Sequence, residues 1–164
     1  MQRDRKTGLV AREGHERFLF SYRTLRVLLE LSSMKKSNQG LVEVAMQARE
    51  KAQALYSQFK VGSALLATDG RVFTGCNLES SSYGLTICSE RVALFKALSE
   101  GAKEFVRIVV VADTEELTAP CGACRQVMWD FCGDIEIVMA NLSGGSKSAR
   151  LSQLFPDPFG SHLF

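Results

Sequence analysis

Three cysteines and one glutamate form the feature that most constrains the fold of this chain. Cys88 is followed two residues later by Glu90, and a second segment reads Pro120-Cys121-Gly122-Ala123-Cys124. Cys121 and Cys124 are one helical turn apart, so their side chains can reach a common point. Cys88 precedes Cys121 by 33 residues. A fold in which the three thiols act together must bring these two distant segments side by side.

Both cysteine segments are predicted to begin helices. Apolar residues recur at helical spacing after Ile87 as far as Gly101, and again from Cys121 to Phe131. Cys88 and Cys121 therefore fall at helix N-termini, where the helix dipole stabilises a thiolate and lowers the pKa of cysteine. Two such termini meeting above a sheet would form a site for a cation bound by sulfur.

The other elements are mostly strands. Strands are predicted over Val61–Thr68, Arg71–Cys76, Val106–Ala112, Ile135–Ala140 and Lys147–Arg150, and helices over Leu41–Tyr56 and, for a single turn, Leu151–Phe155. Asp69-Gly70 is a hairpin signal that joins the first two strands. The continuous apolar run at 106–112 is typical of a buried central strand. This order predicts an α/β fold with a mixed sheet and helices packed on it.

Charge divides the chain into two parts. Residues 1–40 carry nine Lys and Arg against four Asp and Glu, a net charge of +5, whereas the remaining residues carry eleven against fourteen, a net charge of −3. We interpret residues 1–33 as an extension that is disordered or partly helical, and residues 34–164 as a single domain. Met34 opens a segment typical of a natural start. An organelle transit peptide is the alternative, and the four acidic residues argue against it.

Composition excludes several classes of protein. No apolar run approaches the ~18 residues of a membrane helix, and the first twenty residues lack the features of a secretory leader. Five cysteines without such a leader indicate the reducing cytoplasm, where clustered cysteines bind metal more often than they form disulfides. The acidic balance after residue 40 argues against a polynucleotide partner.

The cysteine cluster has the ligand number of a catalytic zinc site. Zinc prefers thiolate and imidazole, with four protein ligands in structural sites and three plus an open position in catalytic ones. The two histidines, His15 and His162, lie near the termini. Cys76 and Cys132 are interpreted as small buried side chains. Cys88, Cys121 and Cys124 are therefore predicted to hold one zinc ion per subunit and to leave its fourth position open.

Two charged residues next to Cys88 complete the chemistry. Glu90, near a zinc-bound water, would remove the proton of that water and later deliver it to substrate. Three thiolates on Zn²⁺ leave a net charge of −1, and the Arg91 guanidinium would offset this charge by donating to sulfur. The alternatives are a Glu90 that only stabilises its helix dipole and an Arg91 that lies on the surface.

Four motifs follow one another along the chain: Tyr56-Ser57-Gln58-Phe59-Lys60-Val61-Gly62, Gly75-Cys76-Asn77-Leu78-Glu79, Ser82-Tyr83-Gly84-Leu85-Thr86-Ile87-Cys88-Ser89-Glu90-Arg91, and Pro120-Cys121-Gly122-Ala123-Cys124-Arg125-Gln126-Val127. The last two match the nucleobase deaminase signature of Cys₃ zinc, a glutamate that is not a ligand, and Pro-Cys-x-x-Cys. Through these four motifs, nearly all of Leu41–Phe159 resembles the small, homotetrameric, three-cysteine class of cytidine deaminases. The resemblance implies a three-layer fold, with a mixed five-stranded sheet and helices on both faces.

The resemblance also implies roles in substrate binding. Asn77 and Glu79, two positions apart at a strand end, would point to the same side and take the ribose hydroxyls. Phe59 would pack against the pyrimidine ring. In the family, a phenylalanine of one subunit enters the site of a neighbouring subunit. Phe159 resembles this phenylalanine, and Tyr83 would lie at the same interface. The alternative for Phe159 is a plug in the core of its own subunit.

Two small departures from the family lie close to the cysteine motif. Ser63 and Ser89 stand where alanine is common in the family. Ser89 is expected to offer its backbone N–H to the base, so its side chain need not alter the chemistry.

The function expected from the resemblance is hydrolytic deamination of cytidine and deoxycytidine to uridine and deoxyuridine, in pyrimidine salvage. Zinc-bound hydroxide would attack C4 with Glu90 as proton shuttle, and ammonia would leave. One rival is another zinc deaminase, acting on blasticidin-type antibiotics or on polynucleotide. A second rival is a zinc-stabilised binding module without catalysis, which predicts four protein ligands and no need for Glu90.

Overall fold

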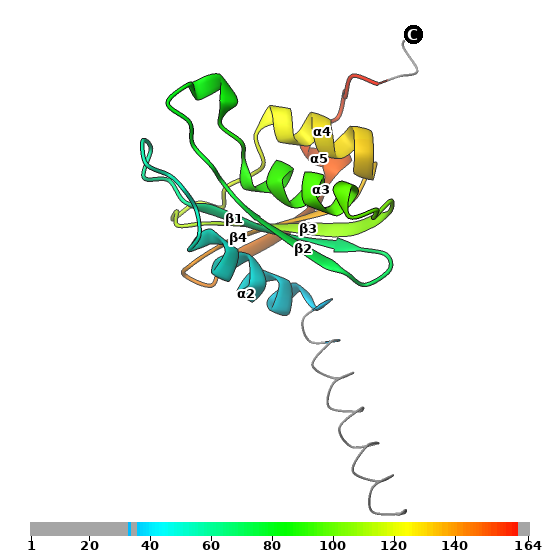
Figure 1. Ribbon diagram of the computed structural model, residues 1–164. Coiled ribbons are helices and arrows are strands. Elements are labelled where there is room, and N and C mark those ends of the chain that lie inside the picture. Colours follow the sequence, from blue (N-terminus) through cyan, green and yellow to red (C-terminus); the bar gives the residue numbers. More distant parts are fainter. Residues whose placement is uncertain (1–32, 34–35, 161–164) are drawn as a thin grey trace, which may run out of the picture. The chain divides into compact units, whose positions relative to one another are not determined.

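A computed structural model describes residue 33 and residues 36–160 of the chain. The rest of the predicted N-terminal extension, His15 and His162 lie outside the described residues. The structure contains a five-stranded sheet in the order β2-β1-β3-β4-β5 (Figure 1). Its strands are β1 (Val61–Ala67), β2 (Val72–Cys76), β3 (Phe105–Ala112), β4 (Glu136–Asn141) and β5 (Ser146–Arg150). The helices of the described residues are α2 (Asn38–Arg49), α3 (Ser89–Ser99), α4 (Gly122–Cys132), the single turn α5 (Leu151–Leu154) and the 3₁₀ turn η1 (Tyr83–Leu85).

The sheet is mixed, which confirms the predicted fold class. β1 pairs antiparallel with β2 and β3, β3 pairs parallel with β4, and β4 pairs antiparallel with β5. A parallel pair needs a crossover between its strands, and α4 is the helix that provides it. Because α4 follows the C-terminal end of the central strand β3, its N-terminus lies at that end of the sheet.

The elements form three layers, with the sheet in the middle. Helix α2 covers one face, and α3, α4 and α5 cover the other (Figure 1). On the α2 side Leu41 and Ala45 pack with Ala64 of β1, and on the opposite side Leu94 packs with Leu65. All seven residues of β1 are buried, because the strand is central and covered on both faces. None of the helices in the described part of the chain has the length and apolar character of a membrane span.

Helix α2 is shorter than the sequence pattern predicts. Its apolar periodicity extends to Tyr56, but the helix ends at Arg49. The backbone N–H of Gln53 donates to the carbonyl of Asn77 at 3.0 Å, and the N–H of Glu79 donates to the carbonyl of Gln53 at 2.9 Å. These bonds require an extended backbone at Gln53, so pairing with a distant segment replaces the last helical turns. The prediction of a helix to Tyr56 was therefore wrong.

The first turn of α3 lies directly on the backbone of β2. A Cβ atom added at Gly75 would overlap with the backbone oxygen of Ser89 and would lie 2.5 Å from the nitrogen of Ala93. Only glycine permits this approach. Since Cys88 is the N-cap of α3, the close contact at Gly75 sets the height of the thiol above the sheet.

We expect Gly75→Ala to destabilise the protein by about 2 kcal/mol or more, because the new methyl group meets backbone atoms that cannot move independently. Urea denaturation would measure the change in the free energy of unfolding. Gly84→Ala is the matched control, since a Cβ at Gly84 meets no heavy atom within 4 Å. Equal effects of the two substitutions would contradict the tight contact between β2 and α3.

Candidate active site

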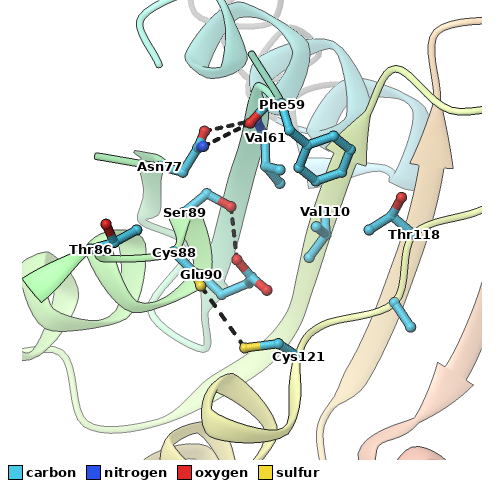
Figure 2. Close-up of a pocket in the computed structure, with 11 residues that line it drawn as sticks. Phe59, Val61, Asn77, Thr86, Cys88, Ser89, Glu90, Val110, Thr118 and Cys121 are labelled. Atoms are coloured by element: carbon cyan, nitrogen blue, oxygen red, sulfur yellow. Dashed lines mark hydrogen bonds between the residues drawn. The ribbon is translucent and has the colours of Figure 1, made fainter. Parts of the chain in front are cut away.

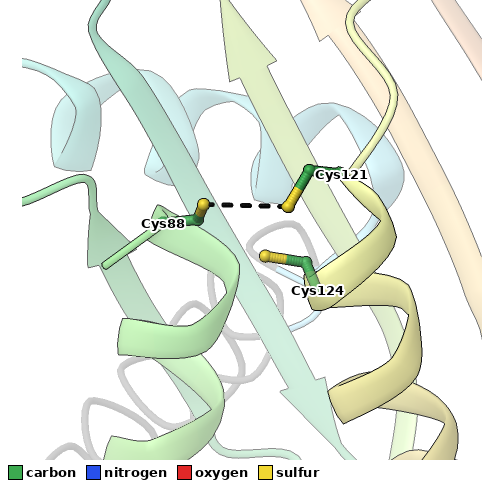
Figure 3. Close-up of side chains that lie close together, drawn as sticks. All are labelled: Cys88, Cys121 and Cys124. Atoms are coloured by element: carbon green, nitrogen blue, oxygen red, sulfur yellow. Dashed lines mark hydrogen bonds between the residues drawn. The ribbon is translucent and has the colours of Figure 1, made fainter. Parts of the chain in front are cut away.

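The structure brings the three predicted cysteines together (Figure 3). Cys88 is the N-cap of α3, Cys121 is the N-cap of α4, and Cys124 lies in the first turns of α4. The three sulfur atoms all lie within 4.8 Å of one another, and the Sγ atoms of Cys88 and Cys121 are 3.9 Å apart. The two helix N-termini thus meet at a single cluster of thiols.

The surroundings of the cluster favour thiolate at Cys88. A hydrogen bond from the Cys124 thiol, together with hydrogen bonds from Arg91 and Cys121, lowers the pKa of Cys88 to about 5, although burial opposes the shift. The same hydrogen bond raises the pKa of Cys124, which holds the shared proton. The lowered pKa of Cys88 favours its thiolate, the form of cysteine that binds a metal ion.

The donors in and around the cluster fit a zinc ion. Three cysteine sulfurs match the preference of zinc for thiolate ligands. The Nη2 atom of Arg91 lies 3.7 Å from Cys88 Sγ and 3.3 Å from the Thr86 carbonyl oxygen. The buried Nε–H of Arg91 has no hydrogen-bond partner among the described residues. A cationic side chain with a spare donor beside the sulfurs suits the excess negative charge of three thiolates on one Zn²⁺.

The other cysteines lie outside the cluster. Burial raises the pKa of the Cys132 thiol to about 12, so this side chain stays neutral at physiological pH. Neither Cys132 nor Cys76 belongs to the group of sulfurs that could share an ion. Within residues 36–160 the cluster consequently offers three protein ligands.

Glu90 lies beside the cluster in the first turn of α3. Its side chain is buried, with 4% of the residue exposed, and its Oε2 atom accepts a hydrogen bond of 2.9 Å from the Ser89 hydroxyl. Burial raises the pKa of this carboxyl group above its usual range. A carboxyl that is held in place and readily takes up a proton is suited to acid–base chemistry.

A mainly apolar pocket opens above Glu90 and the thiols (Figure 2). Figure 2 shows the Glu90 carboxyl group directed into the space between Ser89, Cys121 and the side chains of Phe59 and Val110. The complete lining consists of Phe59, Val61, Asn77, Thr86, Cys88, Ser89, Glu90, Val110, Thr118, Ala119 and Cys121. The predicted site residues Phe59, Asn77 and Ser89 thus share one pocket with Glu90.

Asn77 and Glu79 are both engaged with the loop that carries Phe59. Asn77 Oδ1 accepts from the N–H of Val61, and its Nδ2 donates to the carbonyl of Phe59, each at 2.8 Å (Figure 2). Glu79 accepts from the N–H of Tyr56 at 2.7 Å and from the N–H and hydroxyl of Ser57. These bonds hold the loop against the pocket. The sequence indicates both residues, but a local pattern carries no signal for their contact with this loop.

Glu79 and two further predicted residues lie outside the apolar pocket. Glu79 and Tyr83 line a separate, more open pocket together with Tyr56, and the rings of the two tyrosines meet edge to face with centroids 5.8 Å apart. Phe159 is 59% exposed, and its backbone oxygen accepts from Gln126 Nε2 at 2.8 Å. Because the Phe159 side chain faces outward, it does not plug the core of its own chain.

The Ser89 side chain has a contact that the sequence did not reveal. Its hydroxyl lies 2.6 Å from the hydroxyl of Ser63 on β1, and both serines are completely buried. The two positions are 26 residues apart, so only the packing of α3 on the sheet could show that they meet.

Comparisons with known proteins agree with this site. Residues 35–140 match the family model described as the cytidine and deoxycytidylate deaminase zinc-binding region. A cytidine deaminase of Halalkalibacterium halodurans is 52% identical over 74% of this chain and 92% of its own length, and one of Sporosarcina psychrophila is 47% identical over 73% and 88%. The crystal structure of a cytidine deaminase from Burkholderia pseudomallei superposes with a TM-score of 0.73 and 48% identity, covering 75% of this chain and 99% of that one.

We expect Cys88→Ala to lose bound zinc and stability together, because metal binding and folding are coupled. A ligand present at a thousandfold excess over its dissociation constant stabilises a protein by about 4 kcal/mol, so the thermal transition should fall markedly. Atomic absorption and calorimetry on the same sample would measure both quantities. Cys132→Ala should keep its zinc, and a fully loaded Cys88→Ala protein would refute the ligand assignment.

Proposed function

The chain belongs to the family of zinc-binding cytidine and deoxycytidylate deaminases, and from this membership we propose that it converts cytidine and deoxycytidine to uridine and deoxyuridine with release of ammonia. One observation carries the proposal. Two thiols of the three-cysteine cluster, those of Cys88 and Cys121, line the same apolar pocket as the buried carboxyl group of Glu90. A binding module would need the metal site but not the buried acid beside it.

Cys88, Cys121 and Cys124 would hold the zinc ion, and Arg91 would balance the charge of their thiolates. When bound, zinc supplies a Lewis acid that lowers the pKa of water in the pocket to near neutrality. The three sulfurs leave room for water because the cluster has no fourth protein donor among residues 36–160.

Glu90 would move the proton of the reaction. Its carboxylate would take a proton from the water that adds to C4 and deliver it to N3 of the base. It would then take the proton of the new hydroxyl at C4 and deliver it to the departing amino nitrogen, which leaves as ammonia while C4 becomes a carbonyl. The pKa of Glu90 is raised by burial, so the carboxyl holds the proton between these two steps. Ser89 binds Oε2, and we assign the proton exchange to Oε1.

The walls of the pocket suit a nucleoside base. Phe59 would pack against the pyrimidine ring, with Val61 and Val110 beside it, and the backbone N–H of Ser89 would bind the base. Asn77 and Glu79 would take the ribose hydroxyls, and their bonds to the loop of residues 56–61 support this role because they fix both side chains. A free nucleoside thus fits better than polynucleotide, for which the acidic balance after residue 40 is unfavourable.

We further propose that residues 34–164 form the deaminase domain and that it assembles as a cytoplasmic homotetramer with shared sites. Exposed aromatic side chains support the assembly, since Tyr83 is 75% and Phe159 is 59% exposed. In a tetramer Phe159 would reach the site of a neighbouring subunit. Sedimentation as a monomer at assay concentrations would contradict this assembly.

A site built on reduced thiols supports the proposed cytoplasmic location.

The zinc-loaded protein should release ammonia from cytidine and deoxycytidine, and Glu90→Gln should keep its zinc while the rate falls by a factor of about 10² to 10⁴. The amide retains the shape of the side chain but cannot carry the proton. A coupled ammonia assay and a zinc measurement on each protein would test this expectation.

The same assay separates the rival functions. Unchanged turnover of cytidine by Glu90→Gln would exclude the proposed role of the carboxyl group. Preferred turnover of blasticidin S or single-stranded DNA by the wild-type protein would replace the nucleoside as substrate. A zinc-loaded wild-type protein that releases no ammonia from any of these compounds would favour the binding module.

A further inference from the structure

We propose that the hydroxyls of Ser63 and Ser89 form a positioning pair that fixes the carboxyl group of Glu90 through Oε2. The inference rests on the proposed role of Glu90 as proton carrier. The chain of contacts runs from Ser63 Oγ to Ser89 Oγ at 2.6 Å and from Ser89 Oγ to Glu90 Oε2 at 2.9 Å. Figure 2 shows the second of these contacts.

The direction of the hydrogen bonds follows from the number of protons available. A serine hydroxyl has one proton to donate, and that of Ser89 goes to the carboxylate of Glu90. The bond between the two hydroxyls must then be donated by Ser63. A hydroxyl that accepts one hydrogen bond while it donates another is polarised, and this strengthens the bond it donates. Ser63 thus acts on Glu90 through Ser89, without touching the carboxyl group.

The burial of the pair indicates that the two hydroxyls depend on each other. Both serines are completely buried, and Ser63 lies on β1 between neighbours Gly75 and Val110. A buried hydroxyl without a partner is costly. Among the described residues, the bond to Ser89 is the one that the Ser63 hydroxyl makes. The Ser63 hydroxyl therefore has a hydrogen-bond partner only while the Ser89 side chain is present. The Ser89 hydroxyl, in contrast, keeps its hydrogen bond to Glu90 if the Ser63 side chain is removed.

The contact at Gly75 makes the pair possible. Gly75 lies opposite Ser63 in the sheet, and a Cβ there would overlap with the backbone of Ser89. Because Gly75 has no side chain, α3 packs close enough to the sheet for the hydroxyls of Ser63 and Ser89 to come into contact. The sheet thereby gains a polar connection to the carboxyl group that would carry the proton. Because Oε2 is fixed, Oε1 points to the reacting atoms in one orientation only, which a proton transfer requires.

The kinetic test is a double-mutant cycle on the zinc-loaded protein with cytidine as substrate. Ser89→Ala should lower kcat by about tenfold, the effect expected for one lost hydrogen bond to a charged group. KM should stay unchanged, since the alanine keeps its backbone N–H. Ser63→Ala should lower kcat less, and it should have no further effect in the Ser89→Ala protein, because Ser63 acts only through Ser89.

Thermal unfolding of the same proteins gives a readout independent of activity. Ser89→Ala leaves the Ser63 hydroxyl buried without a partner, so this variant should have the lowest melting temperature of the cycle. The double variant Ser63→Ala/Ser89→Ala should melt at a higher temperature than Ser89→Ala alone, because it removes the stranded hydroxyl. If Ser89→Ala does not fold but the double variant does, the stability comparison is met directly, and a kcat of the double variant about tenfold below wild type and below that of Ser63→Ala tests the positioning role.

Two control variants separate positioning from general damage. Ser99→Ala removes a hydroxyl that donates to the Lys96 carbonyl at the other end of α3, and it should leave kcat and KM unchanged. Ile137→Val removes a methylene from a completely buried side chain on β4, and it should lower the melting temperature without changing kcat. A fall in kcat for Ile137→Val as large as that for Ser89→Ala would overturn the positioning role.

The remaining outcomes distinguish this inference from the proposed function. Additive effects of the two serine substitutions on kcat, or a double variant less stable than Ser89→Ala, would overturn the pair. An inactive Glu90→Gln protein beside serine variants with wild-type kcat would overturn the pair and leave the deaminase assignment intact. Turnover by Glu90→Gln at the wild-type rate would instead remove the proposed role of the carboxyl group, on which the pair depends.

Discussion

The meeting of two helix N-termini at one cluster of sulfurs is the constraint on which the rest of the site depends. Cys88 and Cys121 are both N-caps, so the backbone N–H groups of α3 and α4 lie beside the sulfurs that must bear negative charge. Sheet topology makes the meeting possible, because α4 is the crossover from β3 to β4 and α3 lies next to it on the same face. Glu90 and Arg91 then follow from their positions in the first turn of α3.

Local patterns in the sequence were sufficient to predict most of this framework. Strand runs, the Asp69-Gly70 turn and the helix signals determine the mixed sheet, and the cysteine spacing identifies the two segments that must meet. These features depend on neighbouring residues, so a pattern can reveal them. The grouping of Phe59 and Asn77 with the cysteines in one pocket came instead from resemblance to a family, since 18 residues separate this pair.

The features that the sequence did not reveal all depend on contacts between distant segments. The periodicity of α2 continues past Arg49, but Gln53 bonds to the backbone of residues 77 and 79 and ends the helix. The carboxylate of Glu79 likewise accepts hydrogen bonds from the N–H groups of Tyr56 and Ser57. At Gln53 a long-range backbone hydrogen bond outweighs a local helical preference, and at Glu79 the side chain binds a distant backbone segment. In both cases the partner can be identified only once the sheet has formed.

A contact between distant segments also explains why the sequence did not reveal the role of the Ser89 side chain. From sequence alone, a serine after Cys88 offers a backbone N–H and a side chain of no evident use. In the fold its hydroxyl lies between Ser63 and Glu90. The surrounding layer between the sheet and α3 is apolar and contains Leu65 and Leu94. A polar pair in such a layer is stable only when each member is satisfied. Its orientation is therefore fixed by the apolar packing around it, and a carboxyl group bound to that pair shares the rigidity of the sheet.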